Sequence, residues 1–186
     1  AMSGQFDRVI RTAIGSLYVI AAMQDCAGAV VGYEANGGFL LGFSAQGPTG
    51  ALPPLMTRDA ALPIIAVLTQ SAGMGVKATA QAQPARFTAA DRLQDIDPDT
   101  AAMFLDQLRD SDDAKAAFLI SLGSPCASVD HTDGLRMPLH DGRIVHLRPS
   151  GNAPELRLYA EAGSQSDAQK VLKTLMPVLE RAITPQ

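Results

Sequence analysis

The feature that most constrains the fold is a strictly alternating run near the C-terminus, residues 155–162. Leucine or alanine occupies every second position there, which places these side chains on one face of a β-strand. Residues 143–147 alternate in the same way, and a loop with two prolines, a glycine, a serine and an asparagine separates the two runs. We therefore predict two neighbouring strands joined by a tight loop, with one face of their sheet buried.

An amphipathic C-terminal helix is predicted to cover part of that sheet. Ser166 and Gln169 match a capping box, in which two side chains bond the backbone of the first turn. The residues expected to be buried recur at helical spacing and are Ala168, Val171, Leu172, Leu175 and either Leu179 or Ile183.

Other elements complete this part of the chain. Asp97-Pro98-Asp99 predicts the start of a helix. Its expected core face is Ala102, either Phe104 or Leu105, and Leu108. Three further elements are expected, namely a strand at 86–88, a turn at 91–95 and a short helix at 112–122. Residues 85–186 are therefore predicted to form an α+β domain with an antiparallel sheet packed on helices.

The first part, residues 1–76, is predicted to be a truncated α/β domain with a mixed sheet and flanking helices. A compact apolar run at 29–33 is typical of a strand buried in a parallel sheet, and Gly37-Gly38 predicts a hairpin turn after it. Further expected elements are a strand at 6–12, a helix with Ser16 as N-cap and a helix capped by Thr57. The stretch 71–84 is rich in Gly, Ala and Gln, and we assign 77–84 as a linker.

Charge and composition exclude several classes of partner. The 186 residues carry a net charge of −4, which argues against nucleic acid or an anionic membrane as the main partner. No apolar run reaches the roughly 20 residues of a membrane span, and no signal peptide is visible at the start. The two cysteines, Cys26 and Cys126, have no metal-ligand spacing. They also lie far apart in the sequence, so we expect buried thiols and not a disulfide. Because reduced thiols are typical of a reducing compartment, we expect a cytoplasmic protein.

The loop after residue 147 carries groups that suit phosphate. Arg148 offers a fork of donors matched to phosphate oxygens, while Ser150 and Asn152 add neutral donors. Gly151 lets the backbone turn tightly, so that several N–H groups can point at one anion. Judged by composition alone, a plain surface turn is the better explanation.

A resemblance favours the phosphate site. Arg-Pro-Ser-Gly-Asn-Ala-Pro resembles the phosphate-binding loop of the α-D-phosphohexomutases, whose usual form is Arg-Pro-Ser-Gly-Thr-Glu-Pro. Asn152 stands where threonine is usual, and Ala153 replaces a glutamate. The resemblance implies that substrate phosphate binds to Arg148, Ser150, Gly151, Asn152 and Arg157.

A second loop offers groups for sugar hydroxyls. Glu34 and Asn36 lie two residues apart at a strand end, so their side chains point the same way. A glycine hairpin with exposed polar residues is the better explanation on this ground alone. However, the loop is similar to the family's sugar-specificity loop, Gly-Glu-Met-Ser-Gly-His, with Gly38 where histidine is common. Gly15 and Ser16 resemble a further substrate-contacting turn, which the family writes Arg-Thr-Lys-Val-Gly.

The resemblance covers the third and fourth domains of the family only. Phosphohexomutases interconvert hexose 1-phosphate and hexose 6-phosphate through a phosphoserine and a magnesium loop, and neither motif occurs here. The resemblance thus implies no catalytic and no metal-binding residue in this chain, Mg²⁺ only in the intact enzyme, and no activity of the chain alone. The implied ligands are mannose or glucose 1- or 6-phosphate.

Two alternatives remain open. One is a phosphoglucosamine mutase fragment, and the other is a non-catalytic module that binds a phosphorylated ligand or a protein. Because the first domain is predicted to be truncated, we also expect an open sheet edge through which the chain self-associates.

Overall fold

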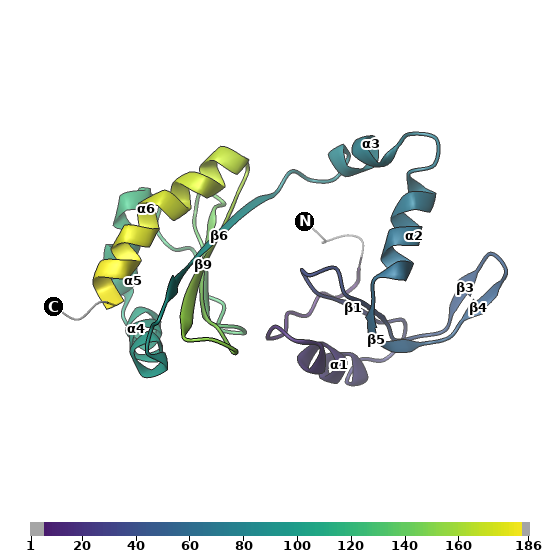
Figure 1. Cartoon of the computed structure of the whole chain (residues 1–186), viewed down its shortest axis with the longest axis horizontal. Coiled ribbons are helices and arrows are strands. Elements are labelled where there is room, and N and C mark those ends of the chain that lie inside the picture. Colours follow the sequence, from purple (N-terminus) through teal and green to yellow (C-terminus); the bar gives the residue numbers. More distant parts are fainter. Residues whose placement is uncertain (1–5, 184–186) are drawn as a thin grey trace. The chain divides into compact units, whose positions relative to one another are not determined.

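The computed structural model describes residues 6–183 and divides the chain into two compact units, Ala1–Pro84 (unit 1) and Ala85–Gln186 (unit 2). Each unit has its own sheet and its own helices (Figure 1). All strand pairs among the described residues are antiparallel. The predicted two-domain α/β architecture is confirmed.

The sheet of unit 2 has four strands in the order β6-β9-β8-β7. They are β6 (Phe87–Gln94), β7 (Leu135–Pro138), β8 (Ile144–Pro149) and β9 (Glu155–Ala162). The two strands predicted from alternation are confirmed as β8 and β9. The turn predicted at 91–95 is wrong for most of its length, because β6 pairs with β9 without interruption from Phe87 to Gln94.

Three helices lie on one side of this sheet (Figure 1). They are α4 (Pro98–Asp110), α5 (Asp112–Leu119), which a 3-10 turn η1 (Ile120–Leu122) extends, and α6 (Gln165–Ile183). The buried stripe of α6 is Ala168, Val171, Leu175, Leu179 and Ile183. It packs with the buried leucines of β9 in one core. The prediction from helical spacing is therefore confirmed for α6.

Two details of the predicted helices are wrong, namely the N-cap of α6 and one core residue of α4. Ser164, and not Ser166, receives the Asp167 N–H at 3.1 Å and donates its hydroxyl to the Asp167 carboxylate at 2.7 Å. The helix therefore begins two residues before the predicted capping box. In α4, Ala101 rather than Ala102 is buried. The start of α4 is as predicted, since the Asp97 carboxylate accepts the Thr100 N–H at 2.9 Å.

The sheet of unit 1 has three strands in the order β1-β2-β5. They are β1 (Val31–Tyr33), β2 (Phe39–Leu41) and β5 (Leu55–Asp59), and a separate hairpin joins β3 (Ala45–Gly47) to β4 (Gly50–Leu52). The hairpin turn between β1 and β2 is confirmed. The expectation of a parallel arrangement at 29–33 is wrong, since β1 pairs only with β2, antiparallel, among the described residues.

The helices of unit 1 are α1 (Ser16–Gln24), α2 (Ala61–Gln70) and α3 (Val76–Gln81). Gly15 is the N-cap residue of α1, so Ser16 is not. Thr57 lies in β5, and Asp59 instead accepts the Ala61 N–H at 2.8 Å at the start of α2. Residues 8–13 form neither helix nor strand, which contradicts the strand predicted at 6–12. The helix α3 occupies most of the stretch that we assigned as a linker.

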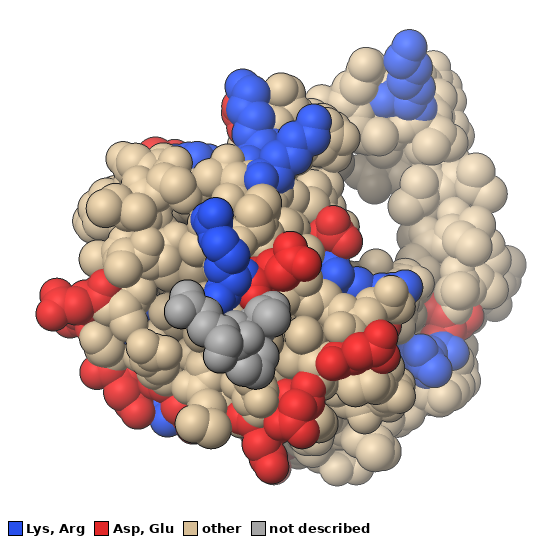
Figure 2. All heavy atoms as spheres, turned by 60° about the vertical axis from the view of Figure 1, so that its left-hand side comes forward, with Lys and Arg blue, Asp and Glu red and all other residues tan. Residues whose placement is uncertain are grey.

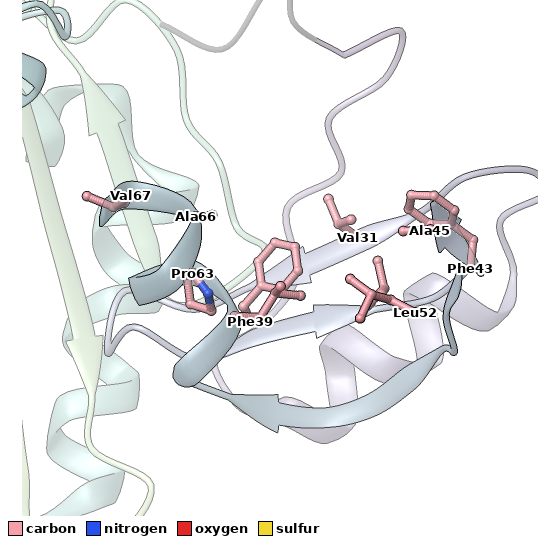
Figure 3. Close-up of a pocket in the computed structure, with 10 residues that line it drawn as sticks. Val31, Phe39, Phe43, Ala45, Leu52, Pro63, Ala66 and Val67 are labelled. Carbon is pink, nitrogen blue, oxygen red and sulfur yellow. The ribbon is translucent and has the colours of Figure 1, made fainter. Parts of the chain in front are cut away.

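Unit 1 contains little buried apolar surface. Its core cluster consists of Val19, Met23 and Leu40, and no residue of α2 is buried. Between α2 and the sheet lies a hollow of about 420 Å³, lined by side chains such as Phe39, Leu52 and Pro63 (Figure 3). Among the described residues, no helix has the length and apolar character needed to cross a membrane.

Candidate phosphate and sugar sites

The outer face of the unit 2 sheet carries a row of arginines. Because alternate residues of β9 face the core, Arg157 points to the opposite side. The strand register places Arg92 of β6 and Arg148 of β8 directly opposite it. Side chains opposite each other in an antiparallel pair share one face. Three arginines thus cross three adjacent strands.

Carboxylates accompany these arginines but do not outnumber them. Glu155 lies 3.4 Å from Arg92 and 3.0 Å from Arg157, while Glu161 lies 3.3 Å from both Arg86 and Arg136. We use the name sheet-face cluster for Arg86, Arg92, Arg136, Arg148, Arg157, Asp133, Glu155 and Glu161. Its five arginines exceed its three carboxylates, so the cluster is locally positive on a chain of net charge −4. A local excess of this kind attracts a small anion.

Arg148 is the most enclosed arginine of the cluster, with 9% of its surface exposed. Its Nε lies 3.6 Å from the Asp133 carboxylate, and its Nη2 donates to the Tyr159 hydroxyl at 3.5 Å. Nε itself is buried and has no hydrogen-bond acceptor within the described part of the chain. Both polar contacts of the guanidinium are long, so it keeps donor capacity for an anion.

The loop that follows Arg148 is held at its base and open at its tip. The Ser150 N–H donates to the Glu155 carbonyl at 2.9 Å, which closes the loop. The Asn152 N–H lies 3.4 Å from the Ser150 hydroxyl, and both Gly151 and Asn152 are exposed. The predicted phosphate residues Ser150, Gly151 and Asn152 are therefore accessible within four residues of Arg148.

An aromatic pair lies beside the arginine row on the same face of the sheet. The His146 ring packs against Tyr159 with ring centres 5.6 Å apart, and its Nε2 lies 2.6 Å from the Asp133 carbonyl oxygen. Burial lowers the pKa of His146, and the bond to Asp133 opposes this only in part. The imidazole is therefore neutral at pH 7 and supports the turn that carries Asp133.

The predicted sugar-binding residues of unit 1 come together from two segments. The Ser16 hydroxyl donates to one oxygen of Glu34 at 2.6 Å, and Asn36 Nδ2 lies 3.5 Å from the other. The Asn36 side-chain oxygen accepts the Gly38 N–H at 2.9 Å. Gly15 immediately precedes Ser16 as the N-cap of α1.

This constellation can bind hydroxyl groups. A carboxylate has about four acceptor positions, and Ser16 and Asn36 occupy only two of those on Glu34. Glu34 is half-buried and Asn36 is exposed, so the remaining acceptors are open to a ligand. Sequence reasoning selected Glu34 and Asn36 in one loop and Gly15 and Ser16 in another, and the fold brings Ser16 within hydrogen-bond distance of Glu34.

Two other features do not belong to either site. The hollow beside α2 is lined by apolar side chains and offers no partner for a phosphate (Figure 3). On the face drawn in Figure 2, acidic and basic side chains are interspersed among a larger uncharged surface, which does not resemble the continuous basic patch of a nucleic-acid-binding protein.

Sequence reasoning missed several members of the sheet-face cluster, above all Arg92. The turn predicted at 91–95 removed this residue from any strand. The available signal was weak, because Leu93 is the only large apolar side chain between Thr88 and Gln94. Glu155 and Asp133 were missed because their roles depend on cross-strand neighbours that no local pattern specifies.

Models of two consecutive domains match the chain. Residues 2–87 match "Phosphoglucomutase/phosphomannomutase, alpha/beta/alpha domain III", and residues 88–177 match "Phosphoglucomutase/phosphomannomutase, C-terminal domain". The chain belongs to the phosphoglucomutase/phosphomannomutase family. The resemblance noted in the two loops is thereby confirmed at the level of the family and of these two domains.

Curated members of the family are similar over almost the whole chain. A phosphomannomutase of Salmonella muenchen is 43% identical over 178 residues, which is 92% of this chain and 36% of the relative. A phosphomannomutase of Sinorhizobium fredii is 38% identical over 94% of this chain and 38% of its own length. The chain therefore spans little more than a third of the curated relatives it matches.

A solved structure shows the same fold. A phosphoglucomutase/phosphomannomutase family protein from Burkholderia thailandensis superposes with a TM-score of 0.61 over 92% of this chain and 32% of its own. The sequence identity in that comparison is 19%, so this likeness concerns the fold alone.

Proposed function

We propose that this chain forms the phosphate- and sugar-binding part of a phosphomannomutase/phosphoglucomutase. As the intact protein, this enzyme interconverts hexose 1-phosphate and hexose 6-phosphate. The observation that carries the proposal is the position of Arg148. It lies in a row of arginines and next to an open loop that provides Ser150, Gly151 and Asn152.

In this proposal each of the two loops recognises a different chemical group of a hexose phosphate. Arg148, Arg157 and the loop bind the phosphate that does not react, because guanidinium groups match phosphate oxygens in pairs. Glu34 and Asn36, with Gly15 and Ser16 behind them, bind sugar hydroxyls. The two curated relatives described above are both named phosphomannomutase, which supports a hexose phosphate as the ligand.

Phosphoryl transfer itself is not assigned to this chain. Within residues 6–183, no three His, Cys, Asp or Glu side chains gather in a position to hold a metal ion. The described residues thus offer no three-ligand group for Mg²⁺, and we derive no step through it. We propose that Mg²⁺ acts in the intact enzyme, where phosphoryl transfer needs its charge, and that the chain alone is inactive.

The proposal also covers location and assembly. Cys26 and Cys126 are free thiols in the structure, which supports a cytoplasmic enzyme. We further propose that the chain self-associates through an outer strand of the unit 1 sheet, β1 or β5. Sedimentation velocity over a range of concentrations tests this, and a monomer at every concentration would contradict it.

An NMR titration with mannose 1-phosphate and glucose 1-phosphate tests the binding role. We expect shifts at Ser150, Gly151 and Asn152 that disappear in Arg148→Ala, because the variant loses the guanidinium. Arg109→Ala is the matched control, since Arg109 is exposed on α4 and pairs there with Asp106 and Asp110. It should leave the shifts unchanged.

Other outcomes separate the alternatives. Added shifts at Glu34 and Asn36 would support recognition of the sugar by unit 1, and a preference for glucosamine 1-phosphate would favour a phosphoglucosamine mutase. Shifts at the unit 2 loop alone, equal for inorganic phosphate, would favour a non-catalytic phosphate-binding module. No shift at millimolar ligand would contradict phosphate binding by this chain.

A further inference from the structure

The Asp133-Gly134 turn packs directly against the strand that carries Arg148. Gly134 has φ +76°, a conformation that side chains rarely adopt. A Cβ at this position would collide with the Leu147 carbonyl oxygen and lie 3.0 Å from the Arg148 Cα. The turn can therefore approach β8 this closely only because residue 134 is glycine.

His146 fixes the same turn through a hydrogen bond. Its Nε2 lies 2.6 Å from the Asp133 carbonyl oxygen, and because a carbonyl only accepts, Nε2 carries the proton. The ring is itself held by packing on Tyr159. Glycine packing on one side and the imidazole on the other leave the backbone of Asp133 little freedom.

The turn places the carboxylate of Asp133 at the Nε edge of the Arg148 guanidinium. Asp133 Oδ2 lies 3.6 Å from Nε, and Nε has no hydrogen-bond acceptor within residues 6–183. Arg148, a residue of β8, is largely buried, so its guanidinium has few alternative orientations. Asp133 is the carboxylate that faces it at this edge.

We propose that Asp133 is a positioning residue for phosphate binding, which rests on the function proposed above. Its carboxylate holds the Nε edge of Arg148, so that the Nη groups, one of which has only a long contact to the Tyr159 hydroxyl, remain for the phosphate at the 150–152 loop. A guanidinium held on one edge loses less freedom when it binds a ligand on the other.

Charge and position predict opposite effects when this carboxylate is removed. If Asp133 acts only as a nearby negative charge, it repels phosphate, and Asp133→Asn tightens binding. If Asp133 positions Arg148, the same substitution weakens binding, and the partners that orient metal ligands, which contribute about tenfold or more, give the expected size of the effect. The direction of the change therefore decides between the two roles.

The experiment measures mannose 1-phosphate binding to the full chain by NMR, together with the Nε–H resonance of Arg148. For Asp133→Asn we expect about tenfold weaker binding and a broadened or faster-exchanging Arg148 Nε–H. Asp133→Glu keeps the carboxylate and should restore part of the affinity. Asp141→Asn is the matched control, because Asp141 also precedes a turn glycine but pairs with Arg143 at 2.6 Å. It should change neither readout.

The failure of this inference can be told apart from the failure of the proposed function. Unchanged or tighter binding in Asp133→Asn would overturn the positioning role while leaving phosphate binding intact. If the wild-type chain binds no phosphate, the proposed function fails for this chain. The Nε–H resonance in the absence of ligand then still tests the inference, and an identical signal in both proteins would overturn it.

Discussion

The two units place their candidate sites on very different supports. Unit 2 has a core cluster of 17 buried residues, whereas the corresponding cluster of unit 1 has three among the described residues. Arg148 lies on a central strand above the larger core, while Glu34 lies in a short hairpin above the smaller one. Positional precision depends on such support, so the phosphate site should be the more rigid of the two.

The helices of the two units differ in burial as well, as a comparison of α2 with α6 shows. It is strongly apolar, yet Ile64 and Ile65 expose 58% and 59% of their surfaces and no residue of the helix is buried. In α6, by contrast, five residues are buried at helical spacing. An apolar helix left uncovered is typical of an interaction surface. Unit 1 therefore gains less stability from its own residues than unit 2 does.

The largest expected effect is the loss of a buried leucine in unit 2. Leu158 is fully buried between the sheet and α6, so Leu158→Ala should lower the free energy of unfolding of unit 2 by about 2–5 kcal/mol. Ile64→Ala in α2 should change the free energy of unfolding of unit 1 by less than about 0.5 kcal/mol, because the side chain is exposed. Urea unfolding of both variants checks the comparison. Equal losses would show that α2 is covered in solution.

The burial of Leu158 could be predicted from the sequence because it depends on a local pattern. Alternation in residues 155–162 fixes which side chains of β9 are buried, and the opposite face then holds Arg157 and Tyr159 without further information. The candidate residues Ser150 and Asn152 were selected from a local signal of the same kind, since they lie close together in one loop; their role in phosphate binding stays a prediction.

The rest depended on contacts between distant segments. Arg92 joins the arginine row only because the whole of β6 pairs with β9, which overrides the turn signal of Asp91 and Asp95. The bond from Ser16 to Glu34 joins residues 18 positions apart and leaves no pattern in the sequence.

The starts of α2 and α6 were misplaced for a related reason. Thr57 and Asp59 both suit the start of α2. Ser164 and Ser166 both suit that of α6, and in each case only the backbone path selects between the two residues.

A smaller effect is expected at the start of α6. Ser164→Ala should lower the free energy of unfolding of unit 2 by about 1 kcal/mol, because the Asp167 N–H loses its acceptor. Ser166→Ala is the control and should have little effect, since its hydroxyl is not the cap. Thermal or urea unfolding measures both. A larger loss for Ser166→Ala would restore the capping box predicted from the sequence.

The smallest expected effect concerns pH and is confined to unit 2, where all three histidines of the chain lie. Burial lowers the pKa of His146 below 6.5, so the unfolded chain binds a proton more readily than the folded one. Stability contributed by the neutral ring is therefore present above pH 6.5 and is lost as the pH falls through the lowered pKa. The slope cannot exceed about 1.4 kcal/mol per pH unit, the limit for one proton.

Urea unfolding between about pH 7.5 and 5.5 (one unit on each side of the ordinary histidine pKa) measures this slope. His146→Gln keeps a side-chain N–H for the Asp133 carbonyl and removes the titration, so its stability should vary less over the interval. Protonation occurs at Nδ1 and keeps the Nε2–H donor to the Asp133 carbonyl, so the loss of stability comes from charging a buried ring and the Asp133 turn should stay in place. Unit 1, followed through the Glu34 amide, should not respond. A matching response there would mean that the two units do not unfold independently, which would remove the main contrast between them.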